Sequence, residues 1–215
     1  MQKGRLGGKR EQTKVLNRAA ILNTARKVFL KRGYDGTSVR DIIRQTGLAA
    51  GTFYNYYPDK ESVFKAIIDH YLQSLSIKVR AERTRATNLE DFIRPAYGVF
   101  FSNIAEDPEA YELTRKNESV LTTMYKSSLM EIISATLRDD IKQAVETGII
   151  PEVDSEMLTA CFVGIAYELG QTMIRRHPAN PEAMTEFATR LFLGGINALP
   201  TFDGAVAVTC DRHVH

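Results

Sequence analysis

The residues best suited to chemistry lie between Thr37 and Lys60, where hydroxyls, an amide and aromatic rings surround Pro58. Such groups donate hydrogen bonds to phosphate oxygens and fix the register of a protein on a polyanion. An enzyme would instead need a nucleophile with a base, a pair of carboxylates or a metal cluster. His213 and His215 belong to a terminal tail, and no His/Cys cluster has metal-ligand spacing. The pattern predicts a binding protein with no catalytic residues, no metal site and no cofactor.

A short helix, a glycine turn and a second short helix must hold these groups in place. Ser38 followed by Asp41 has the spacing of a capping box, in which the acid reaches back to the first free backbone N–H groups. Gly47 lies where the first helix ends and a positive φ is needed, and the apolar side of that helix consists of Val39, Ile42 and Ile43. The next segment, 49–57, is too short to be stable alone and must be held by its neighbours. This is helix-turn-helix geometry, in which the second helix enters the DNA major groove.

Residues 21–64 resemble the N-terminal domain of the TetR family of one-component transcriptional regulators. The matching positions form one ordered set: Ile21, Leu22, Ala25, Phe29, Gly33, Tyr34, Thr37, Ser38, Asp41, Ile42, Gly47, Leu48, Gly51, Thr52, Phe53, Tyr54, Tyr56, Tyr57, Lys60 and Glu61. The rest of the chain matches only in length and helical character. The resemblance implies an all-α fold, with an N-terminal three-helix helix-turn-helix domain joined by a connecting helix to a larger helical ligand-binding and dimerisation domain.

The charge distribution independently indicates a polyanionic partner. Residues 1–60 contain thirteen Lys or Arg and four Asp or Glu, a net charge of +9, whereas residues 61–215 contain fifteen and twenty-two, a net charge of −7. The total of +2 therefore hides a basic N-terminal part and an acidic remainder. A basic surface concentrated in one domain favours double-stranded DNA as the partner. The alternative is an ordinary solvated surface with a basic disordered tail.

The composition predicts a cytoplasmic protein with a sizeable core and no membrane partner. The 215 residues are 44% hydrophobic, which suits one large or two small domains. No run of about eighteen apolar residues occurs, so we expect no transmembrane helix. The N-terminus lacks the apolar region of a secretory signal. Cys161 and Cys210 form no disulfide framework, and Cys161 lies in an apolar helical pattern typical of a buried small hydrophobe.

Helix signals continue along the chain and divide it into regions. We predict a disordered basic arm at 1–12, a helix-turn-helix domain at 13–60, a helical ligand-binding and dimerisation domain at 61–200 and a tail at 201–215. Asp59 is expected to cap a fourth helix, whose apolar stripe from Phe64 to Leu75 outlasts what a three-helix domain could cover. Further helices are expected to begin at Asn88, Asp107, Leu121, Asp154 and Asn180, with the one from Leu121 unbroken to Glu146.

The resemblance places DNA contacts on and around the second and third helices. Arg40 is expected to read a base, since arginine can bond guanine O6 and N7 bidentately; alternatively, it touches only phosphate. Further groove contacts are expected from Ala50, Gly51, Thr52 and Asn55. Phosphate contacts are expected from Thr37, Ser38, Tyr54, Tyr56 and Lys60, and the alternative for Tyr54 is a half-buried structural role.

Aromatic, methionine and polar residues in the body are candidates for binding a small-molecule effector. They are Phe92, Phe100, Tyr111, Met124, Tyr125, Tyr167, Glu168 and Gln171. Such a stripe is either plain core or the lining of the ligand cavity that the resemblance implies. The segment 115–118, Arg-Lys-Asn-Glu, is either a site for an anionic head group or a solvated turn.

Small residues in the last two long helices permit close approach of helices, either within the body or across a two-fold axis. An interior glycine costs about 1 kcal/mol against alanine, so the glycines there indicate a packing reason. The resemblance implies that these helices pair across a homodimer as a four-helix bundle. The interface candidates are Ala160, Gly164, Leu191, Gly194 and Gly195.

Two classes of function compete. The first is a ligand-responsive transcriptional regulator, expected to be a repressor, that binds a palindromic operator as a homodimer and is released by a small apolar or amphipathic effector. The second is a helical ligand-binding protein or enzyme with a basic surface, which the lack of a catalytic constellation disfavours. An architectural DNA binder without a ligand is disfavoured by the length of the body.

Overall fold

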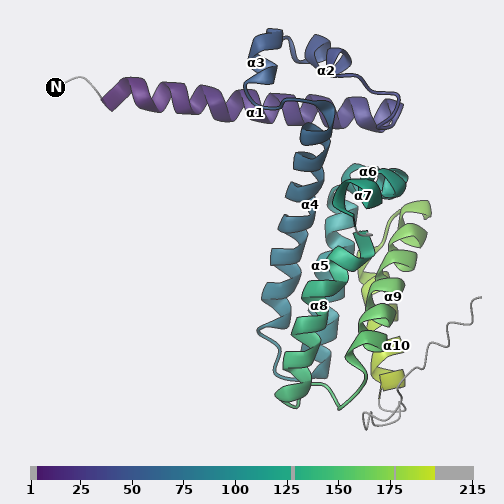
Figure 1. The fold of residues 1–215 in the computed structure, drawn as a ribbon. Coiled ribbons are helices and arrows are strands. Elements are labelled where there is room, and N and C mark those ends of the chain that lie inside the picture. Colours follow the sequence, from purple (N-terminus) through teal and green to yellow (C-terminus); the bar gives the residue numbers. More distant parts are fainter. Residues whose placement is uncertain (1–3, 127–128, 177, 197–215) are drawn as a thin grey trace, which may run out of the picture. The chain divides into compact units, whose positions relative to one another are not determined.

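All regular structure in the described part of the chain is α-helical. The computed structural model describes residues 4–126, 129–176 and 178–196, and Figure 1 shows its ribbon. In chain order the helices are α1 (Gly4–Arg32), α2 (Val39–Thr46), α3 (Ala50–Tyr54), α4 (Lys60–Arg83), α5 (Leu89–Glu106), α6 (Pro108–Lys116), α7 (Glu118–Tyr125), α8 (Leu129–Glu146), α9 (Ser155–Arg175) and α10 (Pro181–Ile196). The predicted all-α fold is confirmed over these residues.

Short polar side chains begin several helices at the predicted positions. Each accepts a hydrogen bond from a backbone N–H group two or three residues further on, which satisfies donors that the first turn leaves free. These caps, with N···O distances of 2.7–3.0 Å, are Asp59, Asn88, Asp107, Asp154 and Asn180. At the other end, Gly33 (φ 72°) and Gly148 (φ 75°) adopt the left-handed conformation after α1 and α8.

Two helices differ from the sequence prediction. α1 begins at Gly4, so residues 4–12, predicted as part of a disordered arm, are the first part of a 29-residue helix. The prediction of one helix from Leu121 to Glu146 is wrong, because Lys126 adopts a left-handed conformation (φ 53°, ψ 24°) and ends α7. Neither glycine nor proline marks this break, so the usual local signal was missing. The predicted tail at 201–215 lies outside the described residues.

Contacts divide the chain into two units, which are described separately. The head unit contains the chain up to Ser76 together with Glu106–Ile132, and the body unit contains Ile77–Ala105 together with the residues from Ile133 onward. This differs from the predicted boundary after residue 60. Most of α4 belongs to the head unit, and so do α6 and α7.

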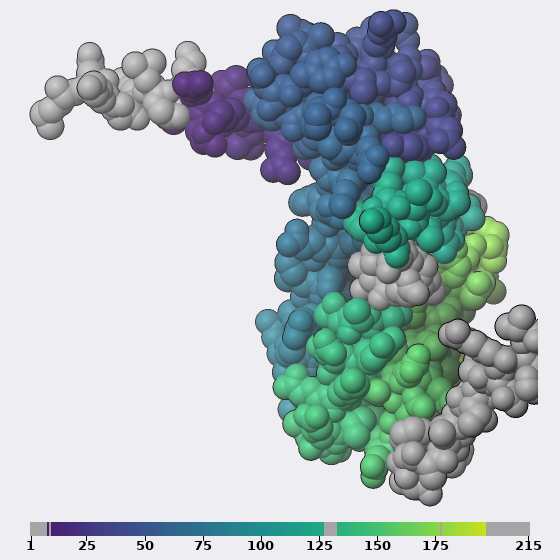
Figure 2. Space-filling view, in the orientation of Figure 1, coloured from purple at the N-terminus to yellow at the C-terminus, as the bar shows by residue number. Residues whose placement is uncertain are grey.

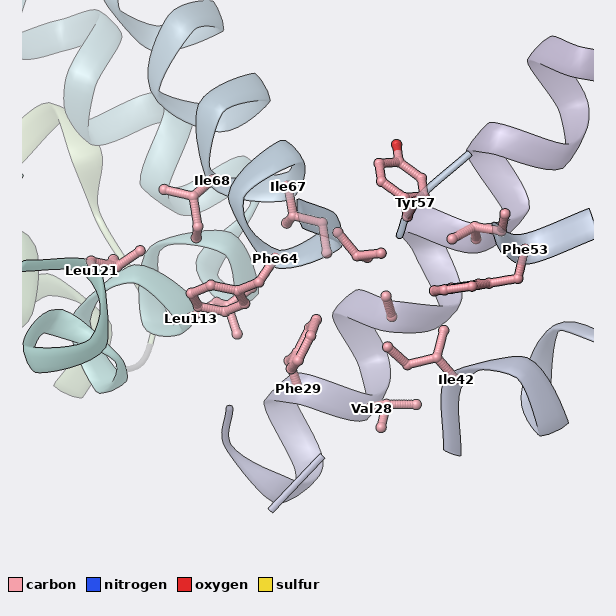
Figure 3. Packing of buried hydrophobic residues seen from close by; sticks show 13 residues of the cluster. Val28, Phe29, Ile42, Phe53, Tyr57, Phe64, Ile67, Ile68, Leu113 and Leu121 are labelled. Atoms are coloured by element: carbon pink, nitrogen blue, oxygen red, sulfur yellow. The ribbon is translucent and has the colours of Figure 1, made fainter. Parts of the chain in front are cut away.

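One buried cluster forms the core of the head unit (Figure 3). Phe29 of α1 meets Phe64 of α4 edge to face, with ring centroids 4.9 Å apart. Leu113 of α6 and Leu121 of α7 are buried in the same cluster at 1% and 0% exposure. Other members come from α1, α2 and α3, namely Ile21, Ala25, Val28, Ile42 and Phe53. The short helices α2 and α3 are therefore held by longer ones.

Aromatic rings form the centre of the body unit. The ring of Phe162 on α9 stacks on Tyr97 of α5 and on Phe192 of α10, with centroid distances of 5.3 and 4.2 Å. The Tyr97 hydroxyl donates a hydrogen bond to Phe162 O at 3.2 Å, so this buried polar group is satisfied. These stacked rings join α5, α9 and α10.

α4 contributes residues to both units. Phe64 and Ile68 near its start are buried in the core of the head unit. In its last turn, Arg83 donates from Nε to Asp140 Oδ2 of α8 at 2.8 Å, and its Nη2 lies 2.6 Å from the same oxygen. The two side chains are only 8% and 4% exposed. Removing one partner of such a buried pair typically costs about 3–5 kcal/mol, so α4 is firmly attached to α8 within the body unit.

α9 is long and apolar enough, by length and composition, to cross a membrane. Its most apolar window has a mean hydropathy of 1.3, and 33% of that window is buried. A single helix of this kind is weak evidence for a membrane span, because core helices of globular proteins have the same length and composition.

Candidate nucleic-acid interface

The helix-turn-helix begins with α2, whose two ends are held by specific contacts. Asp41 N donates to Ser38 Oγ at 3.2 Å and Ser38 N donates to Asp41 Oδ2 at 3.1 Å, which completes the predicted capping box. Hydrogen bonds from Ser38, and then the charge of Arg32, hold the pKa of the Asp41 carboxyl below its usual range. Gly47 (φ 69°) follows α2 in the left-handed conformation. The length and direction of α2 are therefore fixed before α3 begins.

α3 is only five residues long, and one buried ring anchors it. Phe53 is fully buried, and its ring centroid lies 6.4 Å from that of Tyr57. The other side of α3 is open, because a Cβ added to Gly51 would meet nothing within 4 Å. Small residues there let another surface approach the backbone closely. The predicted contact residues on this side are exposed or half-buried: Ala50, Gly51, Thr52, Tyr54 and Asn55.

Arg40 on α2 is exposed and differs from its neighbouring arginines. Arg32 Nη1 lies 2.7 Å from Asp41 Oδ1, and Arg44 Nη2 lies 3.5 Å from the same oxygen. Within the described residues Arg40 has no ion pair. Of these three guanidinium groups, Arg40 is therefore the one without an acidic partner in the described part of the chain.

Two residues predicted to bind phosphate are buried or half-buried within the protein. Thr37 is 3% exposed, and its hydroxyl donates to Gly33 O at 2.7 Å, which argues against a direct phosphate contact. Lys60 Nζ donates to Tyr34 O at 2.9 Å and to Thr37 O at 3.1 Å, and lies 4.2 Å from the centroid of the Tyr34 ring. An ammonium has three donors, so one of them stays free for a phosphate.

The other predicted phosphate contacts lie nearer the surface. Tyr54 is 53% exposed, which does not fit the alternative of a half-buried structural role, and Tyr56 is half-buried. Ser38 is exposed, but its hydroxyl donates to Asp41 Oδ2 at 2.6 Å. The Ser38 oxygen accepts from Asp41 N at 3.2 Å, so Ser38 has no free proton to donate to a phosphate, which argues against the predicted contact.

Contacts from α6 and α7 support this surface, and the sequence analysis missed them. Arg26 Nη1 of α1 donates to Asp107 Oδ2 at 2.7 Å, and Tyr34 N donates to Asn117 Oδ1 at 3.3 Å. Asn117 is buried and its amide donates to Leu113 O at 2.8 Å. Segment 115–118, interpreted as an anion site or a solvated turn, thus contains a structural asparagine. The partners are 81 and 83 residues apart, so no local pattern could reveal them.

The structure does not bring the eight ligand candidates together in one unit. Tyr111, Met124 and Tyr125 belong to the head unit, whereas Phe92, Phe100, Tyr167, Glu168 and Gln171 belong to the body unit. Phe92 is buried, with its ring centroid 6.3 Å from that of Phe162. The Tyr125 hydroxyl donates to Asp69 Oδ1 of α4 at 2.5 Å, and burial, followed by Asp69, raises its pKa. In the described residues no group of three or more potential metal ligands occurs.

An exposed apolar surface, here called the α9–α10 face, carries the interface candidates. Its large members are Met157, Phe187 and Leu191, which are 63%, 59% and 51% exposed. Ala160, Gly194 and Gly195 are exposed, and Gly164 is half-buried. A Cβ added at any of the three glycines would meet nothing within 4 Å. Packing inside one chain therefore gives no reason for these glycines.

Sequence comparisons identify the protein class. The family model described as bacterial regulatory proteins, tetR family, matches residues 21–67. The transcriptional repressor ComR of Escherichia coli K12 is 37% identical over 73 residues, which cover 34% of this chain and 35% of ComR, about a third of that relative's length. The transcriptional activator FasR of Mycolicibacterium smegmatis is 21% identical over 185 residues, which cover 85% of this chain and 84% of FasR.

A solved structure extends the likeness beyond the head unit. The fatty acid degradation regulator FadR of Bacillus halodurans has a TM-score of 0.68 and 19% identity, and the match covers 83% of this chain and 95% of that one. At this identity the likeness shows the fold alone. The capped α2, the turn at Gly47 and the open side of α3 define a helix-turn-helix. Residues 21–67 match the tetR family of bacterial regulatory proteins, and the rest of the described chain shares its helical fold with a regulator of this kind.

Proposed function

We propose that the protein is a ligand-responsive transcriptional repressor that binds a palindromic operator in double-stranded DNA as a homodimer. The observation that carries DNA binding is the open side of α3, where Gly51 has no neighbour within 4 Å of an added Cβ. The major groove of DNA admits an α-helix, and small residues allow that helix to approach the base edges. The net charge of +9 over residues 1–60 supports the same partner.

Base reading is assigned to α2 and α3, and phosphate binding to the residues around them. Arg40 has no ion pair in the described chain and can bond guanine, while Ala50, Gly51, Thr52 and Asn55 provide the remaining groove contacts. Phosphates are bound by Tyr54, Tyr56 and the third donor of Lys60. Ser38 is assigned to capping α2, because its hydroxyl proton is bonded to Asp41 Oδ2. Thr37 is assigned a structural part, because its hydroxyl is buried and bonded to Gly33 O.

The α9–α10 face supports a homodimer. Three exposed large apolar residues beside three glycines in open space form a surface that a second helix pair can approach closely. A patch of this kind on a single chain typically marks an interaction site. Two-fold symmetry would then place two copies of α3 on two half-sites, because a symmetric dimer binds a symmetric operator.

An effector in the body unit and repression complete the proposal. The aromatic residues of that unit favour an apolar or amphipathic molecule over a highly charged one. Relatives include both a named repressor, ComR, and a named activator, FasR. Repression is proposed because a dimer bound across a promoter excludes polymerase without needing any further contact.

Selection of DNA from a random-sequence pool tests this function. The protein should enrich an inverted repeat whose half-sites are about 10–10.5 base pairs apart, or a multiple of that spacing. A pool with no enriched sequence would contradict a sequence-specific regulator. Enrichment of a single half-site, bound by one subunit, would contradict the homodimer while leaving DNA binding intact.

A further inference from the structure

The N-terminal part of α1 continues the core-facing side of that helix beyond the core. Buried residues at spacings of three and four define this side, namely Ile21, Ala25 and Val28. The same spacing, counted back toward the N-terminus, reaches Asn17, Lys14 and Arg10. Lys14 and Arg10 are both exposed. One side of α1 thus changes from apolar to basic where the core ends.

Arg18 marks the place where this basic side leaves the core. Its Nε donates to the hydroxyl of Tyr57 at 3.2 Å, and Tyr57 lies three residues after the end of α3. From Arg18 back to Arg10 an α-helix rises about 12 Å, which is the length of about three to four base-pair steps of DNA. Figure 2 shows the purple part of α1 projecting past the surface that α2 and α3 form, and Figure 1 shows the same helix as a ribbon.

The positive charges near the N-terminus have few acidic residues to compensate them. Residues 1–14 contain five Lys or Arg and one acid, Glu11. Glu11 lies 3.6 Å from Lys14 Nζ, but both side chains are more than half exposed, at 71% and 56%. An exposed pair of this kind is weak and screened by salt. Arg10 and Lys14 can therefore both turn to a polyanion.

We propose that Arg10 and Lys14 bind phosphates of the DNA backbone beside the half-site that α3 contacts. The start of α1 is then a second DNA-binding element, which adds affinity without reading sequence. The inference rests on the proposed DNA-binding function, and it commits to DNA because the basic side runs from the core that holds α3.

A pair of matched variants tests the proposal. Arg10→Gln with Lys14→Gln removes two charges from the basic side, and Lys27→Gln with Lys31→Gln removes two exposed charges from another side of the same helix. Glutamine keeps a helix propensity close to that of lysine and arginine. Operator affinity is measured against salt on two duplexes, one that ends at the half-sites and one with about five further base pairs on each side, beyond the three to four that the extension spans.

The two variants should behave differently on the longer duplex. In the Arg10/Lys14 variant, the slope of log affinity against log salt concentration (the salt slope) should fall by about two for each bound subunit. This variant should also lose the affinity that the flanking base pairs add. The Lys27/Lys31 variant should match the wild type in both respects. Equal losses in both variants, or a wild-type slope for Arg10/Lys14, would overturn the inference. The preference for operator over scrambled DNA should stay unchanged in both, whereas a wild-type protein without such preference would refute the proposed function itself.

Discussion

Arg26 of α1 forms an ion pair with Asp107, the residue that caps α6. Arg26 Nη1 donates to Asp107 Oδ2 at 2.7 Å, while Asp107 Oδ1 accepts a hydrogen bond from Ala110 N at 3.0 Å. One carboxylate thus begins α6 and attaches it to the helix that carries the core of the head unit. The side chains are 27% and 36% exposed, so solvent weakens the pair but does not remove it.

Substitutions at Asp107 should separate its two contributions to stability. Asp107→Asn keeps a capping oxygen and removes the charge, whereas Asp107→Ala removes both and should cost about 1 kcal/mol more in the free energy of unfolding. Arg26→Met is then combined with each Asp107 variant, and the free energy of unfolding in urea is measured for every protein. The interaction energy between residues 26 and 107 should be about 0.5–1 kcal/mol when residue 107 is aspartate and absent when it is asparagine or alanine. Strict additivity of Arg26→Met and Asp107→Asn would show that the ion pair contributes nothing.

Arg40 should discriminate between operator and scrambled DNA. Arg40→Ala is expected to weaken operator binding by about 1–3 kcal/mol, because a bidentate contact to guanine is lost, and to leave scrambled DNA almost unchanged. Arg44→Ala, on the same helix, is the control, since Arg44 is already 3.5 Å from Asp41. Fluorescence anisotropy with both duplexes measures the ratio. An equal loss on the two duplexes would assign Arg40 to phosphate and remove it from base reading.

Lys60 should affect both folding and the salt dependence of DNA binding. Lys60→Met keeps the aliphatic chain but leaves Tyr34 O and Thr37 O without their donor, so the free energy of unfolding should fall by about 1–2 kcal/mol. The third donor is assigned to a phosphate, so the salt slope should also fall by about one. Lys31→Met, at an exposed position of α1, is the control. Lower stability with an unchanged slope would make Lys60 purely structural.

Bulky residues on the α9–α10 face should produce a folded monomer. Gly164→Leu and Gly195→Leu place side chains where one chain leaves open space, so the fold should survive while a second copy is excluded. Sedimentation should show a shift to monomer, and Ala105→Leu, at an exposed position of α5, should remain dimeric. A dimer that persists in both glycine variants would move the interface to another surface.

The sequence revealed the parts of this structure that depend on near neighbours. The capping box joins Ser38 and Asp41, which are three positions apart, and the turn depends on the φ angle of Gly47 alone. Both features were therefore predictable from the sequence. The break at Lys126 was not, because lysine gives no signal for a positive φ.

Longer-range placements could not be predicted for a different reason. Leu113 looks like any apolar residue of an amphipathic helix, and only the folded chain shows that it is buried in the core of the head unit. Lys60 likewise appeared to be a free cation, because the positions of the Tyr34 and Thr37 carbonyls depend on how α1 and α4 pack. The contact residues that the resemblance predicts on α2 and α3 are exposed or half-buried, but the resemblance could not show that Thr37 is buried.

α4 is the proposed connection between a bound effector and the operator. Phe64 and Ile68 hold it in the head unit, and the Arg83–Asp140 pair holds it in the body unit. Asp69, between them, accepts the hydrogen bond of Tyr125 at the end of α7. A change in the position of α4 would therefore alter both its own contacts in the body unit and the support of α3.

A bound effector should weaken the affinity for operator DNA. Bound operator should weaken the affinity for the effector by the same factor. The coupling should be about 1–3 kcal/mol, since each ligand acts only through its different affinity for the two states. Protein stripped of small molecules is titrated with operator in the presence and absence of apolar and amphipathic compounds, and the same compounds are titrated with and without operator. Tyr125→Phe removes only the hydroxyl that donates a hydrogen bond to Asp69. It should reduce the coupling factor while leaving the affinity for operator alone and the affinity for effector alone nearly unchanged. A compound that binds the body unit and leaves operator affinity unchanged would refute the coupling and leave the DNA-binding assignment intact.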